Sequence, residues 1–310
     1  MIRTKVKNQK EIIEEVPPSL ILTSDWHLRE REDQPECRMD SYWAAQWKKI
    51  DYISRLQKKY HCPVIHAGDL FDYWKPSPHL LSETIKHIPK DFRTVYGQHD
   101  LPQHNIELAY KCGIETLVRA GKVELLPEVH FGMLPKYGSL LFPNSHSDRM
   151  IVVWHFLTYI GRKPFPNCTS PYSDSADILL KKYSKFDLIV TGDNHQAFAI
   201  NNGKGRWLVN PGSLMRMTAA QVNHKPCIYF WYKETNSVKV HFIPVEKGVI
   251  SREHIENKES RDKRIEAFIS RLDTEWESNI SFEENLKRFE EKNQVRKSVM
   301  NIVRKAIENE

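Results

Sequence analysis

The stretch that decides the fold runs from Val64 to Ser77 and has the sequence V-I-H-A-G-D-L-F-D-Y-W-K-P-S. A short apolar run ends at Gly68 and Asp69, and a second carboxylate, Asp72, follows three residues later. Apolar runs bounded by turn residues are typical of buried strands, and glycine lets the backbone approach a ligand closely. An aspartate in this place is also common in ordinary turns, where it bonds its own backbone. The stretch therefore predicts a strand that ends in an acidic loop, with both roles open for Asp69.

Composition and charge are those of an ordinary globular protein. A chain of 310 residues exceeds one average domain, so we expect one main domain with an appendage. Ser251 to Glu310 contains 13 Lys/Arg and 14 Asp/Glu, a balance of −1, and the total of +6 therefore leaves +7 on the first 250 residues. This basic excess is compatible with a polyanionic substrate and equally with a device for solubility.

The cysteines and the N-terminus indicate the cellular setting. Five cysteines without a C-x-x-C pair fit neither a zinc finger nor a disulfide framework: Cys37, Cys62, Cys112, Cys168 and Cys227. The first residues are charged where a signal peptide needs an apolar stretch, and no run of about 18 apolar residues follows. We therefore expect a cytoplasmic, reducing location and no membrane segment.

Polar side chains that suit a metal follow five predicted strands. They are Asp25 and His27; Asp69 and Asp72; Gln98, His99 and Asp100; His155; and Asp193 and His195. Open sheets gather their ligand sites at the carboxyl ends of the strands, so these five loops are expected to converge on one crevice. Clustered carboxylate, imidazole and amide groups predict a pair of divalent cations, which can activate water and hold the oxygens of a phosphate during in-line displacement.

The proposed division of labour has Asp69 as the carboxylate that bridges two metals. The other ligands form two sets, with Asp25, His27 and His195 on one metal and Gln98, His155 and Asp193 on the other. His99 then stands clear of both metals, where it can stabilise developing charge or protonate the leaving oxygen as a general acid.

The order of these motifs resembles a known superfamily. The series D-x-H, G-D-x-x-D, G-x-H-D, a lone H and G-x-x-H, from Asp25 to His195, is similar to that of the calcineurin-like metallophosphoesterases. The text G-D-L-F-D-Y-W-K-P-S resembles the nuclease subunit of double-strand-break repair complexes, the SbcD and Mre-eleven type, recombination nucleases of phages among them. The run N-P-G-S-L-M-R from Asn210 and the F-I-P at Phe242 are similar to the same family. The resemblance implies an α/β metallophosphoesterase fold, a central β-sandwich flanked by helices, with a C-terminal helical extension.

The domain organisation follows from this resemblance and from the helical pattern near the C-terminus. We predict an N-terminal tail over 1–17, the metallophosphoesterase domain over 18–248 and the helical extension over 249–310. In the extension, Ser281 to Glu284 forms a capping box that opens a helix, and its apolar stripe continues to Ala306. The extension is either a packed helical hairpin or, as the resemblance suggests, a surface that docks on an SMC-like, SbcC-type ATPase.

The function implied by the resemblance is a divalent-metal-dependent DNA exo/endonuclease, the catalytic subunit of an SbcCD-like recombination and repair complex. Its implied partners are DNA and the SMC-like ATPase subunit, with a homodimer as a further option. Two other functions stay open: a phosphatase or cyclic-nucleotide phosphodiesterase on the same core, and a non-catalytic DNA-binding scaffold subunit.

Two positions depart from the family pattern. Gln98 stands where the family has asparagine, and Asp193 stands where it has the first histidine of G-H-x-H. An additional carboxylate favours harder ions, so Mn²⁺ is the expected metal and Mg²⁺ the alternative to it, both ahead of Zn²⁺. The other interpretation is that these changes leave an inactive site. The resemblance also counts Asp72 and Asp100 among the catalytic groups, as supports for His99, although each could instead cap its loop.

Overall fold

The computed structural model describes residues 16–127, 138–141, 149–161, 163, 173–275 and 281–307. Most of the predicted N-terminal tail therefore lies outside the described residues. The contacts divide the chain into two compact units, Met1–Ser251 and Arg252–Glu310, each of which is described by itself.

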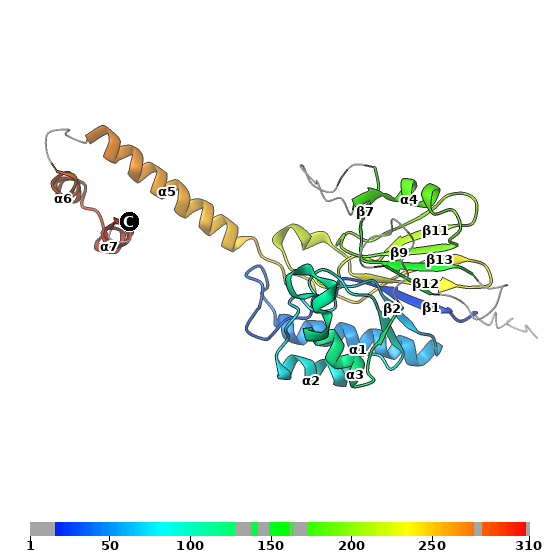
Figure 1. The fold of residues 1–310 in the computed structure, drawn as a ribbon. Coiled ribbons are helices and arrows are strands. Elements are labelled where there is room, and N and C mark those ends of the chain that lie inside the picture. The colour runs from blue at the N-terminus through cyan, green and yellow to red at the C-terminus, as the bar shows by residue number, and fades with distance from the viewer. Residues whose placement is uncertain are drawn as a thin grey trace, which may run out of the picture. The chain divides into compact units, whose positions relative to one another are not determined.

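The first unit contains a six-stranded sheet in the order β13-β12-β1-β2-β3-β4 (Figure 1). Its strands are β1 Leu20–Thr23, β2 Val64–His66, β3 Phe92–Thr94, β4 Glu124–Leu125, β12 Cys227–Tyr232 and β13 Ser237–Phe242. Strands β1 to β4 are parallel, and β12 and β13 form an antiparallel hairpin at one edge. The buried strand predicted in the opening stretch is confirmed as β2.

A second sheet of five strands has the order β10-β11-β9-β6-β5. Its strands are β5 Gly138–Leu141, β6 Ile151–Trp154, β9 Leu188–Thr191, β10 Phe198–Asn201 and β11 Trp207–Asn210. The three central strands β6, β9 and β11 run parallel to one another. A short parallel pair, β7 Leu157–Tyr159 and β8 Ser173–Ser175, lies apart from this sheet.

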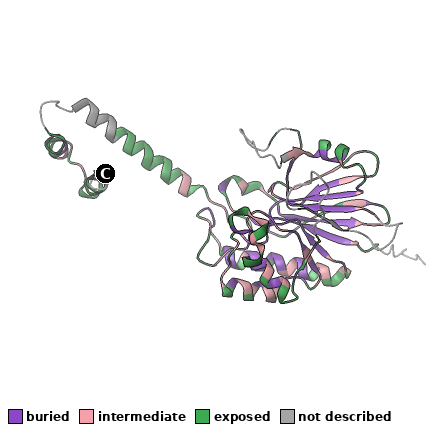
Figure 2. Cartoon of the chain, viewed as in Figure 1, coloured by how far each residue is buried: buried purple, intermediate pink, exposed green. Residues whose placement is uncertain are grey.

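The two sheets enclose a shared apolar core, and the side chains alternate across them. Leu20 and Leu22 of β1 belong to the same buried cluster as Ile151 and Val153 of β6, whereas Ile21 packs on the other face. Strands buried on both faces are expected where helices cover the outer faces. The helices α1 Tyr42–Tyr60, α2 Pro78–His87 and α3 Gly113–Arg119 cover the first sheet, and α4 Ala176–Lys182 covers the second (Figures 1 and 2). The predicted β-sandwich flanked by helices is confirmed.

The second unit consists of α5 Glu253–Glu275, α6 Phe282–Asn293 and α7 Lys297–Ile307. Ser281 caps α6 as expected, because its side chain accepts a hydrogen bond from the amide of Glu284. The prediction of one stripe continuing from Ser281 to Ala306 was wrong in one respect, since the helix is interrupted: α6 ends at Asn293 and is followed by Gln294. That residue has a left-handed φ of 49°, a conformation that ends helices. Among the described residues, none of the helices is long and apolar enough to cross a membrane.

Candidate metal centre

The loops after β1, β2, β6 and β9 bring together two triads of possible metal ligands that share Asp25, and a third group, His27, Asp72 and His99, adjoins them. Ligand atoms of Asp25, His27 and His195 lie within 4.8 Å of one another, and the same holds for Asp25, Asp69 and His155. Parallel strands deliver these loops to the same edge of each sheet, as the sequence pattern predicted. The five residues come from both sheets, so the site is formed where the carboxyl ends of the two sheets meet.

The carboxylate of Asp69 lies between the two triads. Its Oδ2 is 3.1 Å from Nε2 of His155 and 3.7 Å from Nε2 of His27. Its Oδ1 accepts a hydrogen bond of 2.8 Å from the amide of His99. One oxygen is therefore committed to the loop after β3, while the other faces a histidine from each triad, which is the placement that a bridging carboxylate needs.

Several buried atoms of the site lack hydrogen-bond partners. Nδ1 of His155 donates to the carbonyl of Ala67 at 2.8 Å, so in the neutral ring Nε2 carries a lone pair toward Asp69. Nε2 of His27 lies 3.1 Å from Nε2 of His195. Oδ2 of Asp25 has no hydrogen-bond partner, and Nε2 of His155 has only the Asp69 carboxylate at 3.1 Å. Buried acceptors that face one another in this way fit a bound cation, and a backbone carbonyl on the far nitrogen is the usual support of a metal-ligating histidine.

The electrostatics of the site also favour cations. Burial alone would raise the pKa of Asp69, but His155 and His27 outweigh it and hold that pKa well below its usual range. For His155, burial lowers the pKa, and the charge of Asp69 more than reverses this effect. Burial raises the pKa of Asp193, and the neighbouring Asp25 and Asp69 add to that rise. The mutual repulsion of these buried carboxylates would be relieved by bound divalent cations.

The backbone at the site is strained. Asp25, His27, Asp69 and Asp193 have positive φ angles of 49°, 45°, 57° and 74°. Non-glycine residues in this region cost about 1–3 kcal/mol each and cluster at functional sites. Four of the predicted ligands thus share a left-handed backbone conformation, which fits loops that are shaped for binding.

Two glycines permit the close approach of the loops. Gly68 has a φ of 89°, and a Cβ built on it would lie 2.6 Å from Nδ1 of His155. A Cβ on Gly97 would overlap the backbone and the carboxylate of Asp69. Larger residues at either position would push the loop after β2 away from its neighbours.

The two residues that depart from the family pattern contact each other. Nε2 of Gln98 donates to Oδ1 of Asp193 at 3.0 Å, and the amide of Asp193 donates to Oδ1 of Asp25 at 3.0 Å. Gln98 and Asp193 thus lie beside the triads without belonging to either. Of the seven predicted ligands, the structure places five in the triads and these two next to them.

Asp100 has the loop-capping role rather than the one of steering the His99 ring. Its Oδ2 accepts from the amides of Asp69, Leu70 and Gly97, and its Oδ1 accepts from the amide of Phe71. Both oxygens are thereby turned to the backbone, and neither bonds the imidazole. Burial, followed by the charge of Asp69, raises the pKa of Asp100 to about 7 against the opposing effect of the amides.

His99 is anchored by the backbone of Asp72. Nδ1 of His99 donates to the carbonyl oxygen of Asp72 at 3.0 Å, which leaves Nε2 for proton exchange. The Asp72 carboxylate instead lies 2.9 Å from Nη2 of Arg29 and 3.3 Å from Nδ1 of His27. Asp72 therefore contacts His99 through its main chain and not through its carboxylate. Sequence reasoning missed Arg29, although its position two residues after His27 was the available signal.

Asn210 is a second residue that sequence reasoning missed, because its N-P-G-S context indicated only a turn. The side chain is fully buried, and its Nδ2 donates to the carbonyls of Asn194 at 2.6 Å and Gln196 at 2.8 Å. Its Oδ1 accepts from the hydroxyl of Thr191 at 3.1 Å. Asn210 thus holds the loop that carries His195.

Comparison with known proteins identifies the family. Residues 19–229 match the calcineurin-like phosphoesterase superfamily domain. The chain belongs to this superfamily. Superfamily membership and the two triads together support a metal-dependent phosphoesterase.

Two curated relatives carry the name DNA double-strand break repair protein Mre11. The protein from Methanosarcina acetivorans is 27% identical over 224 residues, and the one from Methanosarcina mazei is 26% identical over 223 residues. Each match covers 65% of this chain and 34% of the relative. The chain thus spans about a third of the length of the curated relatives it matches.

Solved structures to which the chain is similar are more distant in sequence. Vacuolar protein sorting 29 from Cryptosporidium parvum is 14% identical, with a TM-score of 0.37 over 75% of this chain and 100% of that chain. A metallophosphoesterase from Sphaerobacter thermophilus is 11% identical, with a TM-score of 0.37 over 73% of this chain and 89% of that chain.

Proposed function

We propose that this superfamily member is a divalent-metal-dependent nuclease that hydrolyses phosphodiester bonds of DNA. The observation that carries the proposal is the buried pair of triads around Oδ2 of Asp69, which faces His155 and His27. The names of the two curated relatives support DNA as the substrate. The net charge of +7 on the first 250 residues suits binding of a polyanionic substrate such as DNA.

The proposed ligands keep the two sets expected from the sequence. Asp25, His27 and His195 hold one ion, His155 with Gln98 and Asp193 holds the other, and Asp69 bridges them. Bound there, divalent ions would lower the pKa of water and polarise the phosphate. The carboxylates Asp25, Asp69 and Asp193 make Mn²⁺ the favoured ion and Mg²⁺ the next.

The chain itself supplies the proton for the leaving oxygen. The hydrogen bond from Nδ1 to the carbonyl of Asp72 holds the ring of His99 in one conformation, in which Nε2 can face the substrate. A positioned acid of this kind contributes about 10²- to 10⁴-fold to the rate. The amide of His99 also bonds Asp69, which ties the proton donor to the metal bridge.

The test uses purified protein with linear and circular DNA, single- and double-stranded, in the presence of Mn²⁺, Mg²⁺, Zn²⁺ or a chelator. We expect Mn²⁺-dependent hydrolysis that Asp69→Asn abolishes. Asp91→Asn is the matched control, because Asp91 is a partly exposed carboxylate paired with Arg93 outside the site. Faster hydrolysis with Zn²⁺ would contradict the metal assignment, and DNA binding without cleavage would indicate a scaffold subunit. Preference for nucleoside monophosphates or cyclic nucleotides would identify the phosphatase or phosphodiesterase alternative.

We further propose that the second unit docks on an SMC-like ATPase. Apolar side chains remain exposed on its helices, among them Ile265, Phe282 and Val299. Deleting residues 256–310 should abolish co-purification with the ATPase and preserve hydrolysis of a small phosphodiester. Val299→Asp should weaken the complex more than Asn301→Asp, which adds the same charge at another exposed position of α7. Loss of both activities in the deletion would show that the unit is needed for folding.

A further inference from the structure

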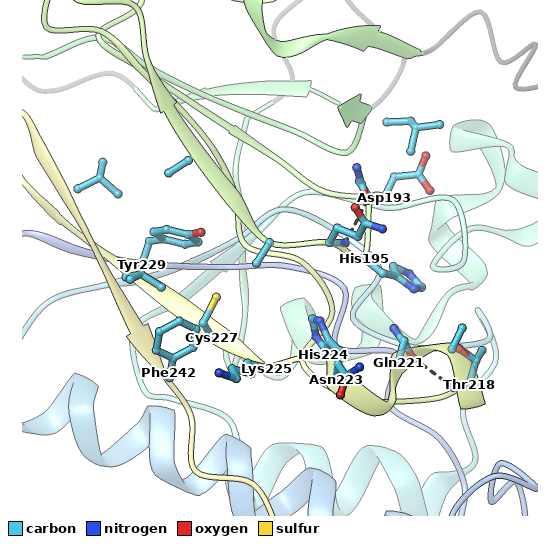
Figure 3. A pocket seen from close by; sticks show the side chains of 18 residues that line it. Asp193, His195, Thr218, Gln221, Asn223, His224, Lys225, Cys227, Tyr229 and Phe242 are labelled. Carbon is cyan, nitrogen blue, oxygen red and sulfur yellow. Dashed lines mark hydrogen bonds between the residues drawn. The ribbon is translucent and has the colours of Figure 1, made fainter. Parts of the chain in front are cut away.

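A cavity of about 980 Å³ opens beside the metal centre and includes Asp193 and His195 in its lining (Figure 3). One wall comes from β10 at the edge of the second sheet, and the other comes from the hairpin of β12 and β13 at the edge of the first sheet. Residues 218–225 add a further, polar side. The cavity thus lies where the β-sandwich is open at one edge, next to the candidate metal centre.

The two ends of the cavity differ in polarity. Figure 3 shows Asp193 and His195 on one side and Tyr229 and Phe242 on the other, with Asn223, His224 and Lys225 between them. The wall formed by the hairpin, away from the metal centre, is apolar and is lined by Tyr229, Val238, Val240 and Phe242. A molecule that fills the cavity must therefore be polar at the metal end, where bound cations would favour an anionic group, and apolar at the far end.

Phe242 is the most exposed part of the apolar wall. Its side chain keeps 57% of its surface exposed, whereas Tyr229 across the hairpin is buried. An aromatic ring held on a strand and exposed inside a cavity loses little conformational entropy when a flat ligand covers it. Phe242 is thus suited to stacking, and its exposure means that truncation should not disturb the core.

We propose that this cavity binds a nucleoside of the substrate strand, with its phosphate at the metal centre and its base stacked on Phe242. The inference rests on the proposed nuclease function and specifies its substrate. A nucleotide has the required polarity, with an anionic phosphate and a base whose faces are apolar. The volume lies within the range of about 300–1,000 Å³ that small-molecule sites occupy, so one or two nucleotides fit.

The proposed site selects for unpaired DNA. A base inside a duplex is stacked and paired, so it can enter the cavity only from a single strand, a frayed end or a flipped position. Lys225 is an exposed cation in the lining that can contact the backbone of the strand. Single-stranded and end-proximal nucleotides are therefore the preferred substrates.

Binding of single-stranded oligonucleotides with non-hydrolysable phosphorothioate linkages, in the presence of Mn²⁺, tests the site without dependence on turnover. Base stacking on an aromatic side chain predicts that Phe242→Ala raises the Kd about 5- to 150-fold, and that Phe242→Tyr stays close to the wild type. Tyr110→Ala is the matched control, because Tyr110 is 64% exposed and does not line the cavity. An oligonucleotide of the same length with abasic residues should bind the wild type about as weakly as Phe242→Ala binds the ordinary one. It should lose little further affinity in the variant, because both changes remove the same contact.

Hydrolysis separates this proposal from the nuclease proposal. With Mn²⁺ we expect Phe242→Ala to raise KM for single-stranded DNA and to change kcat little. Equal affinity of wild type and Phe242→Ala for the ordinary oligonucleotide, or equal affinity of the wild type for ordinary and abasic strands, would overturn the nucleoside site even if DNA is cleaved. If binding depends on the base but no DNA is cleaved with any metal, the nucleoside site would be supported and the proposed nuclease function would be refuted.

Discussion

Replacing Asp100 tests whether this residue organises the loops of the site or acts on His99. Its Oδ2 accepts three backbone amides and its Oδ1 accepts one. In Asp100→Asn the amide oxygen can take the place of Oδ2, and the new NH₂ group then faces the amide of Phe71. The Phe71 amide and the new NH₂ group are then both buried donors without an acceptor, and each costs about 1–3 kcal/mol. Asp100→Ala leaves four donors and should cost about 4 kcal/mol or more.

Thermal unfolding measures the difference. For a unit of this size, about 1 kcal/mol corresponds to a shift of about 2–4 °C in Tm, so Asp100→Ala should lower Tm by about 8–16 °C and Asp100→Asn by less. Asp91→Asn serves as the control. Its carboxylate is paired with Arg93 at the surface, where such pairs contribute about 0–1 kcal/mol.

The alternative role predicts a different pattern. If Asp100 steered the imidazole of His99, Asp100→Asn would keep the Tm of the wild type and would shift the pH profile of kcat. That result would refute the loop-capping role and the reasoning from the four amides.

Four further predictions concern the site and its surroundings. His99→Asn should lower kcat by about 10²- to 10⁴-fold without changing the Mn²⁺ affinity seen in thermal titrations, and a change in that affinity would make His99 a ligand. Mn²⁺ at about 100 times its Kd should stabilise the protein by about 2.7 kcal/mol, and a chelator should reverse the rise in Tm. Burial, followed by the charges of Arg38 and Arg216, lowers the pKa of Lys49 to about 7. Between about pH 7 and pH 10 the Lys49 amine therefore holds a proton in the unfolded chain but not in the folded one. The free energy of unfolding should rise with pH over this range. Lys49→Met should remove that rise, and parallel Tm curves for the two proteins would contradict it. Gln98→Asn and Asp193→His should each weaken activity more than the double variant does, which steady-state kinetics can decide.

The order of the motifs in the sequence predicted much of the fold and the grouping of the candidate ligands. The strand from Val64 and the acidic loop after it are where the sequence placed them, and five of the seven expected ligands, Asp69 among them, form the two triads. This succeeded because parallel strands place their carboxyl ends at one edge, so motifs far apart in sequence must meet.

The remaining features depend on contacts that no local pattern encodes. Asp100 was expected near His99 because the two are adjacent, but adjacency does not fix direction, and four amides from two loops bind its carboxylate instead. Asn210 belongs to a turn motif, and its function became visible only through the carbonyls of the loop before His195. The left-handed φ of 57° at Asp69 is a conformation that aspartate adopts more often than most residues, but the sequence did not indicate it.

The two departures from the family pattern acquire a common explanation in the structure. Taken singly, Gln98 carries its amide one methylene farther than asparagine would, and Asp193 reaches less far than histidine would. The longer side chain comes from the loop after β3 and the shorter one from the loop after β9, and they meet in a hydrogen bond of 3.0 Å. A change in reach on one side of the site is thus offset by the opposite change on the other. This complementarity favours a site adapted to a different ligand set over a site that has decayed, because independent losses have no reason to fit each other.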